Sequence, residues 1–332
     1  MKNSTNFIKK MDEIFWQNKK IIITGGYGFL GSRVVNKLKS FYNPPEVIIF
    51  HKRDFNLVKE NDVKKLFETH KNIDLVIHLA GDVGGIGYNR RFPGEILYNN
   101  LMMNTLMMEY SRKYGVKKFV GIGSVCSYPK FTPVPFKEEN LWNGYPEETN
   151  APYGLAKKMM LVQGQAYRQQ FNFNAIHLLM INLYGPGDDF DPDNSHVIGG
   201  LIKKFCEAKK KNLKELVAWG TGKPTREFLY VDDAVEAIIL ATEKYNKPEP
   251  VNIGSGKEVS IKELADLIAN LTGFNGKIIW DTSKPDGQPR RCLNVSKAEK
   301  EFGFKALTSL EEGLKKTIQW YKQNIEGYKD EK

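Results

Sequence analysis

Residues 20–31 decide the fold and read Lys-Ile-Ile-Ile-Thr-Gly-Gly-Tyr-Gly-Phe-Leu-Gly. The four β-branched residues from Ile21 to Thr24 predict a buried strand, because such side chains favour the pleated backbone. A helix-like pattern of apolar residues follows over 32–38. The segment therefore predicts a strand, a glycine-rich turn and a helix in direct succession.

The glycines of this turn are spaced three residues apart, at Gly25, Gly28 and Gly31. In a dinucleotide-binding loop the first glycine allows a tight turn and the second lets the backbone approach a pyrophosphate. The third lets the helix pack closely on the strand. The free N–H groups at the helix start, around Phe29 and Leu30, attract phosphate. We therefore expect these five residues to bind a dinucleotide; the alternative is a glycine turn without a ligand.

Short apolar runs alternate with longer amphipathic stretches from Lys19 to about Ile181. Parallel strands read as continuous apolar runs because helices cover both faces of their sheet. The pattern predicts an α/β fold with a Rossmann-type, doubly wound parallel sheet. The predicted strands cover residues 20–23, 46–50, 75–78, 118–122 and 175–181.

The later chain predicts a smaller, discontinuous lobe. Glycine and proline become frequent after Leu183, and an α/β rhythm resumes over 225–242. We expect a last strand over 250–253 and helices over 261–271 and 310–324. The predicted nucleotide-binding domain comprises residues 1–182 plus about 226–253. The predicted substrate lobe comprises about 183–225 plus 254–332.

Composition is that of a soluble globular protein, with 332 residues of which 41% are hydrophobic and 27% charged. No apolar run is long enough to span a membrane, and the N-terminus lacks the apolar core of a signal peptide, so we expect a cytoplasmic protein. The three cysteines are too few and scattered for a disulfide framework or a zinc site, and we expect no metal. The net charge of +10 permits a nucleic-acid interpretation. The lysines are spread out, however, and a basic cleft for a phosphorylated ligand explains the charge equally well.

The end of the second predicted strand concerns the choice of cofactor. NAD enzymes commonly place an acid there for the ribose 2′-hydroxyl, whereas NADP enzymes place positive charge for the 2′-phosphate. Here His51, Lys52 and Arg53 precede the first acid, Asp54. We expect NADP(H), with Arg53 the best phosphate ligand because its guanidinium is planar. Solvated loop charges are the alternative. We also expect Ala80, after the third strand, to contact the cofactor.

A serine, a tyrosine and a lysine complete a reductase pattern. Ser124 follows the fourth predicted strand, while Tyr153 and Lys157 share one face of a helix that opens at Ala151. Reduction of a ketone needs a proton for its oxygen, and a tyrosine can supply it if a nearby ammonium lowers the tyrosine's pKa. Ser124, at a strand end, can hydrogen-bond the same oxygen.

Together these residues resemble the extended short-chain dehydrogenases, and the intervening sequence is similar to their GDP-L-fucose synthase branch (GDP-4-keto-6-deoxy-D-mannose 3,5-epimerase/4-reductases). The matching stretches run in order along nearly the whole chain. They are residues 83–86 (Val-Gly-Gly-Ile), 123–130 (Gly-Ser-Val-Cys-Ser-Tyr-Pro-Lys), 182–186 (Asn-Leu-Tyr-Gly-Pro), 194–198 (Asn-Ser-His-Val-Ile), 226–229 (Arg-Glu-Phe-Leu) and 283–287 (Ser-Lys-Pro-Asp-Gly).

The resemblance implies an NADPH-dependent enzyme that inverts C3 and C5 of a GDP-linked 4-keto sugar and then reduces C4. It implies proton transfer by Cys126 and His196, whose chemistry suits the task because both side chains can titrate near neutrality. It also implies a homodimer. The substrate-binding positions that it implies are Asn182, Lys204, Trp219, Arg226 and Asp286.

The chain departs from the family pattern at two positions: Tyr27 stands where well-known members carry a basic residue, and Lys204 where members often carry arginine. Three other functions share much of the pattern. A redox-neutral epimerase would use the same Tyr153 and Lys157. A C4 reductase of a related GDP-hexose or GDP-heptose would need neither Cys126 nor His196. A catalytically idle dinucleotide-binding protein predicts the loss of such residues, and all are present.

Overall fold

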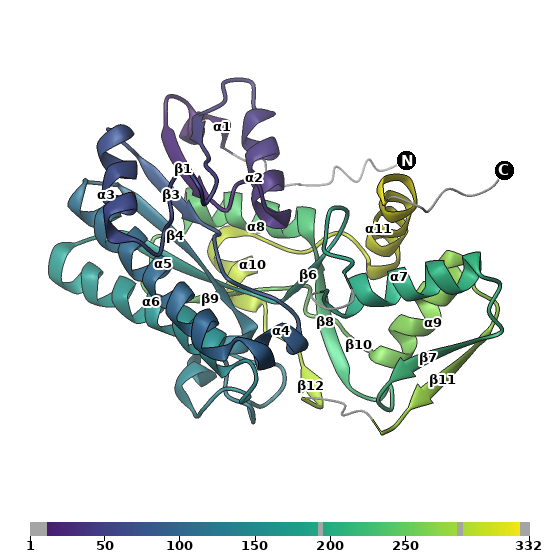
Figure 1. The fold of residues 1–332 in the computed structure, drawn as a ribbon. Coiled ribbons are helices and arrows are strands. Elements are labelled where there is room, and N and C mark those ends of the chain that lie inside the picture. Colours follow the sequence, from purple (N-terminus) through teal and green to yellow (C-terminus); the bar gives the residue numbers. More distant parts are fainter. Residues whose placement is uncertain (1–11, 192–194, 284–287, 326–332) are drawn as a thin grey trace, which may run out of the picture.

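The computed structural model describes residues 12–191, 195–283 and 288–325. Its central sheet has six parallel strands in the order β2-β1-β3-β4-β5-β9 (Figure 1). Strands β2 and β3 flank β1 on opposite sides, so the order of strands reverses at β1. Sheets of this kind bind ligands at the carboxyl ends of the strands beside such a reversal, here β1 and β3. The strands are β1 (Lys20–Thr24), β2 (Glu46–Ile48), β3 (Leu75–His78), β4 (Lys118–Ser124), β5 (Ala175–Met180) and β9 (Val251–Ile253).

Helices cover both faces of this sheet. On one face α2 (Phe29–Lys39), α8 (Val231–Lys244) and α10 (Ser296–Phe302) enclose an apolar cluster that includes Trp16. On the other face α3 (Glu60–Thr69), α5 (Pro93–Lys113) and α6 (Ala151–Phe171) enclose a second cluster. The fold class predicted from the sequence is confirmed. Shorter helices are α1 (Glu13–Trp16), α4 (Ile86–Arg91), η1 (Val125–Ser127) and η2 (Glu138–Trp142).

A second lobe has its own apolar cluster and two small sheets. In one sheet β8 pairs with β6, β10 and β12; in the other β7 pairs with β11. Three helices pack on these strands (Figure 1). The elements are β6 (Asn182–Tyr184), α7 (Val197–Lys210), β7 (Glu215–Trp219), β8 (Thr225–Tyr230), β10 (Glu258–Ser260), α9 (Ile261–Thr272), β11 (Lys277–Asp281), β12 (Arg290–Arg291) and α11 (Leu310–Asn324).

Two segments pack with a different part of the molecule from the one to which the predicted domain boundaries assign them. Strand β8, expected in the nucleotide-binding domain, belongs to the second sheet. Leu293 and Phe304, expected in the substrate lobe, pack in the cluster beneath α2 and α8. The chain thus crosses between the two parts more often than predicted, because short apolar runs do not reveal which sheet they join. In the described part of the chain, no helix is long and apolar enough to cross a bilayer. No group of three metal-binding side chains occurs there either.

Candidate active site

The glycine loop has a backbone that requires glycine at two of its three positions. Gly25 has a φ of +67°, and a Cβ there would approach the backbone nitrogen of Ala80 to 3.0 Å. A Cβ on Gly31 would collide with the carbonyl oxygen of Gly25. Gly28 caps α2, and a Cβ on it would meet only that carbonyl, at 3.2 Å. The helix start is therefore approachable by a ligand backbone, which fits a pyrophosphate.

Buried hydrogen bonds hold the ends of β1 and β3 at this loop. The Thr24 hydroxyl accepts the N–H groups of Leu79 (3.1 Å) and Ala80 (3.0 Å) and shares a 2.8 Å hydrogen bond with His78. His78 also bonds Asn104, at 3.0 Å. Burial, and secondarily the charge of Lys157, lowers the pKa of His78 to about 3, so the imidazole is neutral. Sequence reasoning missed His78 and Asn104, because apolar strand patterns give no sign of buried polar pairs.

The three basic residues after β2 are exposed, and their side chains have different contacts. The His51 ring stacks on Tyr27 of the glycine loop, with centroids 4.0 Å apart and planes 2° from parallel. Arg53 faces Asp54 at 3.9 Å, a weak exposed pair that leaves the guanidinium available. Tyr27 thus holds the His51 ring against the glycine loop by stacking.

The serine and cysteine after β4 lie against the start of α6. The Ser124 hydroxyl accepts the N–H of Cys126 at 3.1 Å. A Cβ on Gly154 would collide with the Cys126 carbonyl oxygen, and Ser127 donates to the Gly154 carbonyl at 2.9 Å. Glycine at this position lets α6 approach η1 closely, and Tyr153 is thereby brought beside Cys126.

Lys157 is buried, and burial lowers its pKa to about 8. Its Nζ lies 5.7 Å from the centroid of the Tyr153 ring. A Cβ on Gly81, three residues beyond the end of β3, would lie 3.6 Å from that Nζ and 3.3 Å from the buried Asn100 amide oxygen. The expected lowering of the tyrosine's pKa was wrong. Burial, followed by the charge of Cys126, raises the pKa of Tyr153.

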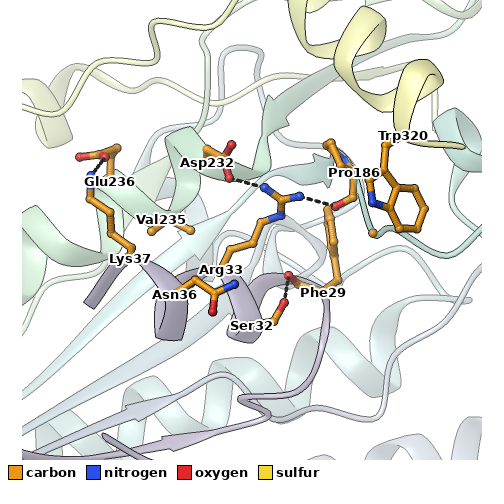
Figure 2. A pocket seen from close by; sticks show the side chains of 11 residues that line it. Phe29, Ser32, Arg33, Asn36, Lys37, Pro186, Asp232, Val235, Glu236 and Trp320 are labelled. Carbon is orange, nitrogen blue, oxygen red and sulfur yellow. Dashed lines mark hydrogen bonds and ion pairs between the residues drawn. The ribbon is translucent and has the colours of Figure 1, made fainter. Parts of the chain in front are cut away.

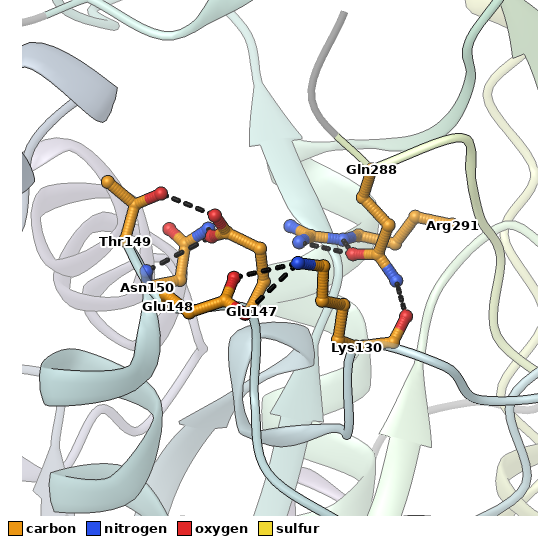
Figure 3. A network of polar contacts seen from close by, with 7 residues as sticks. All are labelled: Lys130, Glu147, Glu148, Thr149, Asn150, Gln288 and Arg291. Carbon is orange, nitrogen blue, oxygen red and sulfur yellow. Dashed lines mark hydrogen bonds and ion pairs between the residues drawn. The ribbon is translucent and has the colours of Figure 1, made fainter.

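An arginine from the second lobe reaches the cysteine. Arg291 Nη1 lies 3.8 Å from Cys126 Sγ. The Gln288 amide oxygen accepts from Arg291 Nε at 3.1 Å and Nη2 at 2.8 Å, and the Gln288 amide nitrogen donates to the Lys130 carbonyl at 3.0 Å (Figure 3). Lys130 in turn pairs with Glu148 at 2.9 Å. Sequence reasoning missed Arg291 and Gln288.

The expected substrate residues lie on the second lobe. Arg226 of β8 is the register partner of Arg291 on β12, so the two arginines stand side by side. Lys204 of α7 lies over the Trp219 ring, 5.1 Å from its centroid, and Trp219 is 67% exposed. The Asn182 amide donates to the Glu227 carbonyl at 3.1 Å. Asp286 lies outside the described residues.

His196 is the N-cap residue of α7. Its side chain is exposed, yet the surrounding protein atoms lower the pKa of the imidazole, while Asp189 opposes this shift. Among the described residues no hydrogen bond or ion pair joins His196 to Cys126. Their joint action on one substrate stays a prediction.

A pocket of about 520 Å³ lies beside α2 (Figure 2). Arg33 spans it, donating to Asp232 (2.7 Å) and to the Pro186 carbonyl (2.7 Å). Of the predicted site residues that the structure describes, Phe29 alone lines this pocket. We interpret the hydrogen bonds of Arg33 across this pocket as the contacts that hold the loop after β6 against α2.

Comparisons with known proteins identify the family and the fold. A model of the NAD dependent epimerase/dehydratase family matches residues 21–254. "Probable GDP-L-fucose synthase 1" of Oryza sativa subsp. japonica is 43% identical over 92% of this chain and 93% of its own. The crystal structure of a GDP-L-fucose synthetase from Naegleria fowleri bound to NADP has a TM-score of 0.85 at 30% identity, covering 94% of this chain and 96% of that one. MlghC, a GDP-mannoheptose C4 reductase from Campylobacter jejuni with NADP bound, has a TM-score of 0.84 at 29% identity, covering 92% and 99%.

Proposed function

This chain belongs to the NAD dependent epimerase/dehydratase family. From that premise we propose that it is an NADPH-dependent nucleotide-sugar epimerase/reductase, which converts GDP-4-keto-6-deoxy-D-mannose to GDP-L-fucose. The main support for this proposal is the position of Cys126, which lies beside Ser124 and the Arg291 guanidinium. Inversion of C3 and C5 needs a base at such a place, whereas reduction of C4 alone does not.

Cofactor binding is assigned to the glycine loop and the exposed cations beyond β2. The N–H groups at the start of α2, around Phe29 and Leu30, would hold the pyrophosphate, with Gly25 and Ala80 at the base of the site. Lys52 and Arg53 supply positive charge for the 2′-phosphate, and His51 lies beside them as a further contact. The bound NADP of the Naegleria fowleri relative supports this choice.

In the reduction step Tyr153 donates its hydroxyl proton to the C4 oxygen. NADPH, when bound, supplies the hydride to C4. Ser124 hydrogen-bonds the same oxygen as negative charge develops on it. Lys157 is charged below its pKa of about 8 and stabilises the tyrosinate that remains. The raised pKa of Tyr153 keeps its hydroxyl protonated until negative charge develops on the C4 oxygen and the proton is transferred.

In the epimerisation steps the 4-keto group acidifies the protons on C3 and C5. The Cys126 thiolate removes such a proton and becomes a thiol, leaving an enolate on the sugar. An imidazolium at His196 returns a proton to the opposite face and becomes neutral. Exchange with solvent restores both groups, so each inverted centre acquires a solvent proton.

Substrate binding is assigned to the second lobe. Arg226 binds the diphosphate through its planar fork, while Trp219 packs on the guanine or sugar with Lys204 beside it. Asn182 and Asp286 belong to the same proposed site. Apolar side chains on α5 and α6 support a homodimer: Tyr98 is 57% exposed, Met159 41% and Val162 40%. A cytoplasmic location completes the proposal.

The test is turnover of GDP-4-keto-6-deoxy-D-mannose with NADPH in D₂O, with the product identified by NMR. We expect GDP-L-fucose with deuterium at C3 and C5. Reduced product without deuterium at either carbon would contradict epimerisation. In that case the chain would be a C4 reductase of a related GDP-sugar, a second candidate favoured by its similarity to the GDP-mannoheptose C4 reductase.

A further inference from the structure

We propose that Arg291 is a positioning residue that stabilises the thiolate of Cys126, and that Gln288 holds the arginine in place for this task. The inference rests on the proposed role of Cys126 as the base. It deepens that role by naming the cation that lies against the sulfur and favours its charged form. A thiolate, rather than a thiol, is required to take a proton from carbon.

The first support is the contact itself. Among the guanidinium's contacts, Nη1 points at Cys126 Sγ, 3.8 Å away, while Nε and Nη2 both bind the Gln288 amide oxygen. Gln288 is itself anchored, because its amide nitrogen donates to the Lys130 carbonyl at 3.0 Å. Figure 3 shows the Arg291 and Gln288 side chains meeting above Lys130. Because the amide of Gln288 is neutral, its contact with Arg291 does not cancel the charge of the guanidinium, as a carboxylate would.

The second support is the charge balance around the sulfur. Tyr153 faces Cys126 from α6, and Lys157 lies behind the tyrosine ring. Lys130, on the loop after η1, is neutralised by Glu148. Arg226 stands beside Arg291 on the neighbouring strand and adds to the positive potential. Among these groups Arg291 is the one cation in contact with the sulfur. A cation within about 4–6 Å of an acidic group favours its charged form.

The neighbouring arginine provides a matched control. Arg290 precedes Arg291 on β12, but its guanidinium pairs with Glu258 and is exposed. Replacing Arg290 removes the same charge from the same strand without removing a contact to Cys126. A general electrostatic effect would appear in both variants, whereas a contact effect appears only at Arg291.

The experiment measures the rate of alkylation of the whole protein by iodoacetamide from pH 5.5 to 10, without substrate. Cys126 is half-buried whereas Cys206 and Cys292 are buried, and Cys126→Ser supplies the blank. For Arg291→Met we expect the midpoint of the rate profile to move about one pH unit higher, which slows alkylation near pH 7 about tenfold. Arg291→Lys should restore most of the rate, Gln288→Leu should lose part of it, and Arg290→Met should match the wild type.

A profile for Arg291→Met that coincides with the wild type would overturn the inference, provided circular dichroism and NADPH affinity show an intact fold. If Arg291 only bound the substrate diphosphate, its replacement would raise the KM for the nucleotide sugar and leave the alkylation profile unchanged. The proposed function fails separately: if Cys126→Ser still incorporates deuterium at C3 and C5, the base is another residue. That outcome does not depend on whether Arg291 moves the alkylation profile.

Discussion

Replacing Glu227 with glutamine should destabilise the protein and misplace Arg226 and Arg291, the two arginines of the proposed site. The Glu227 side chain is buried, and its two oxygens accept the N–H groups of Gly256 and Leu293, each at 2.7 Å. A glutamine keeps one acceptor and turns an NH₂ toward the other N–H. One charge-assisted hydrogen bond is lost and one buried N–H is left unpaired, at a cost of about 2–4 kcal/mol. Burial raises the pKa of Glu227, which shows that the buried charge itself is unfavourable. Removing that charge offsets part of the cost of about 2–4 kcal/mol.

We therefore expect a net loss near 2 kcal/mol. With an unfolding entropy of about 2.1 cal/mol/K per residue, a chain of this length should melt about 3 °C lower. Scanning calorimetry measures this shift, with Glu68→Gln as the control because its carboxylate is exposed and pairs only loosely with Lys64, at 3.7 Å.

The functional consequence follows from chain position. Glu227 is next to Arg226, and its partner Leu293 is two residues from Arg291. The KM for the nucleotide sugar should rise in Glu227→Gln, while the Kd for NADPH should stay unchanged. An unchanged melting temperature together with an unchanged KM would refute the view that this carboxylate supports the two arginines.

Three further predictions concern the reaction and its cofactor. Tyr153→Phe should lower the rate of reduction about 10²–10⁴-fold and leave NADPH binding intact; a variant within a few-fold of wild type excludes Tyr153 as the proton donor. Because burial lowers the pKa of Lys157 to about 8, the ammonium is lost above that pH, so kcat/KM for reduction should fall about tenfold per pH unit there. Lys157→Met should lack this inflection. Arg53→Ala should weaken NADPH binding about tenfold and NADH binding little, as titration calorimetry would show; equal wild-type affinities for the two would contradict the assignment.

The elements predicted best are those whose signal is local. The helix over 310–324 was predicted to the residue, and the strands of the central sheet within two residues at each end. The glycine loop was equally readable, because a positive φ at Gly25 and a close approach at Gly31 both demand glycine.

Contacts that join distant segments were the ones that sequence reasoning missed. Strand β12 has two residues, too few for any periodic pattern, and it is defined by pairing with β8 far earlier in the chain. The approach of Arg291 to Cys126 depends on that pairing. The same reason applies to β8, which was expected in the nucleotide-binding domain and pairs with β6, β10 and β12 in the second sheet. The raised pKa of Tyr153 depends on burial, which an i,i+4 spacing does not report.

The place of β9 at the edge of the central sheet has a consequence for synthesis of the protein. Its partner β5 is buried along its whole length, yet about seventy residues of chain separate the two strands. A ribosome adds about 5–20 residues per second, so the apolar edge of β5 stays unpaired on the nascent chain for several seconds. An open edge of this kind templates association with other chains. Translation that stalls between these strands should therefore produce aggregating fragments, and chaperone binding should peak in that interval.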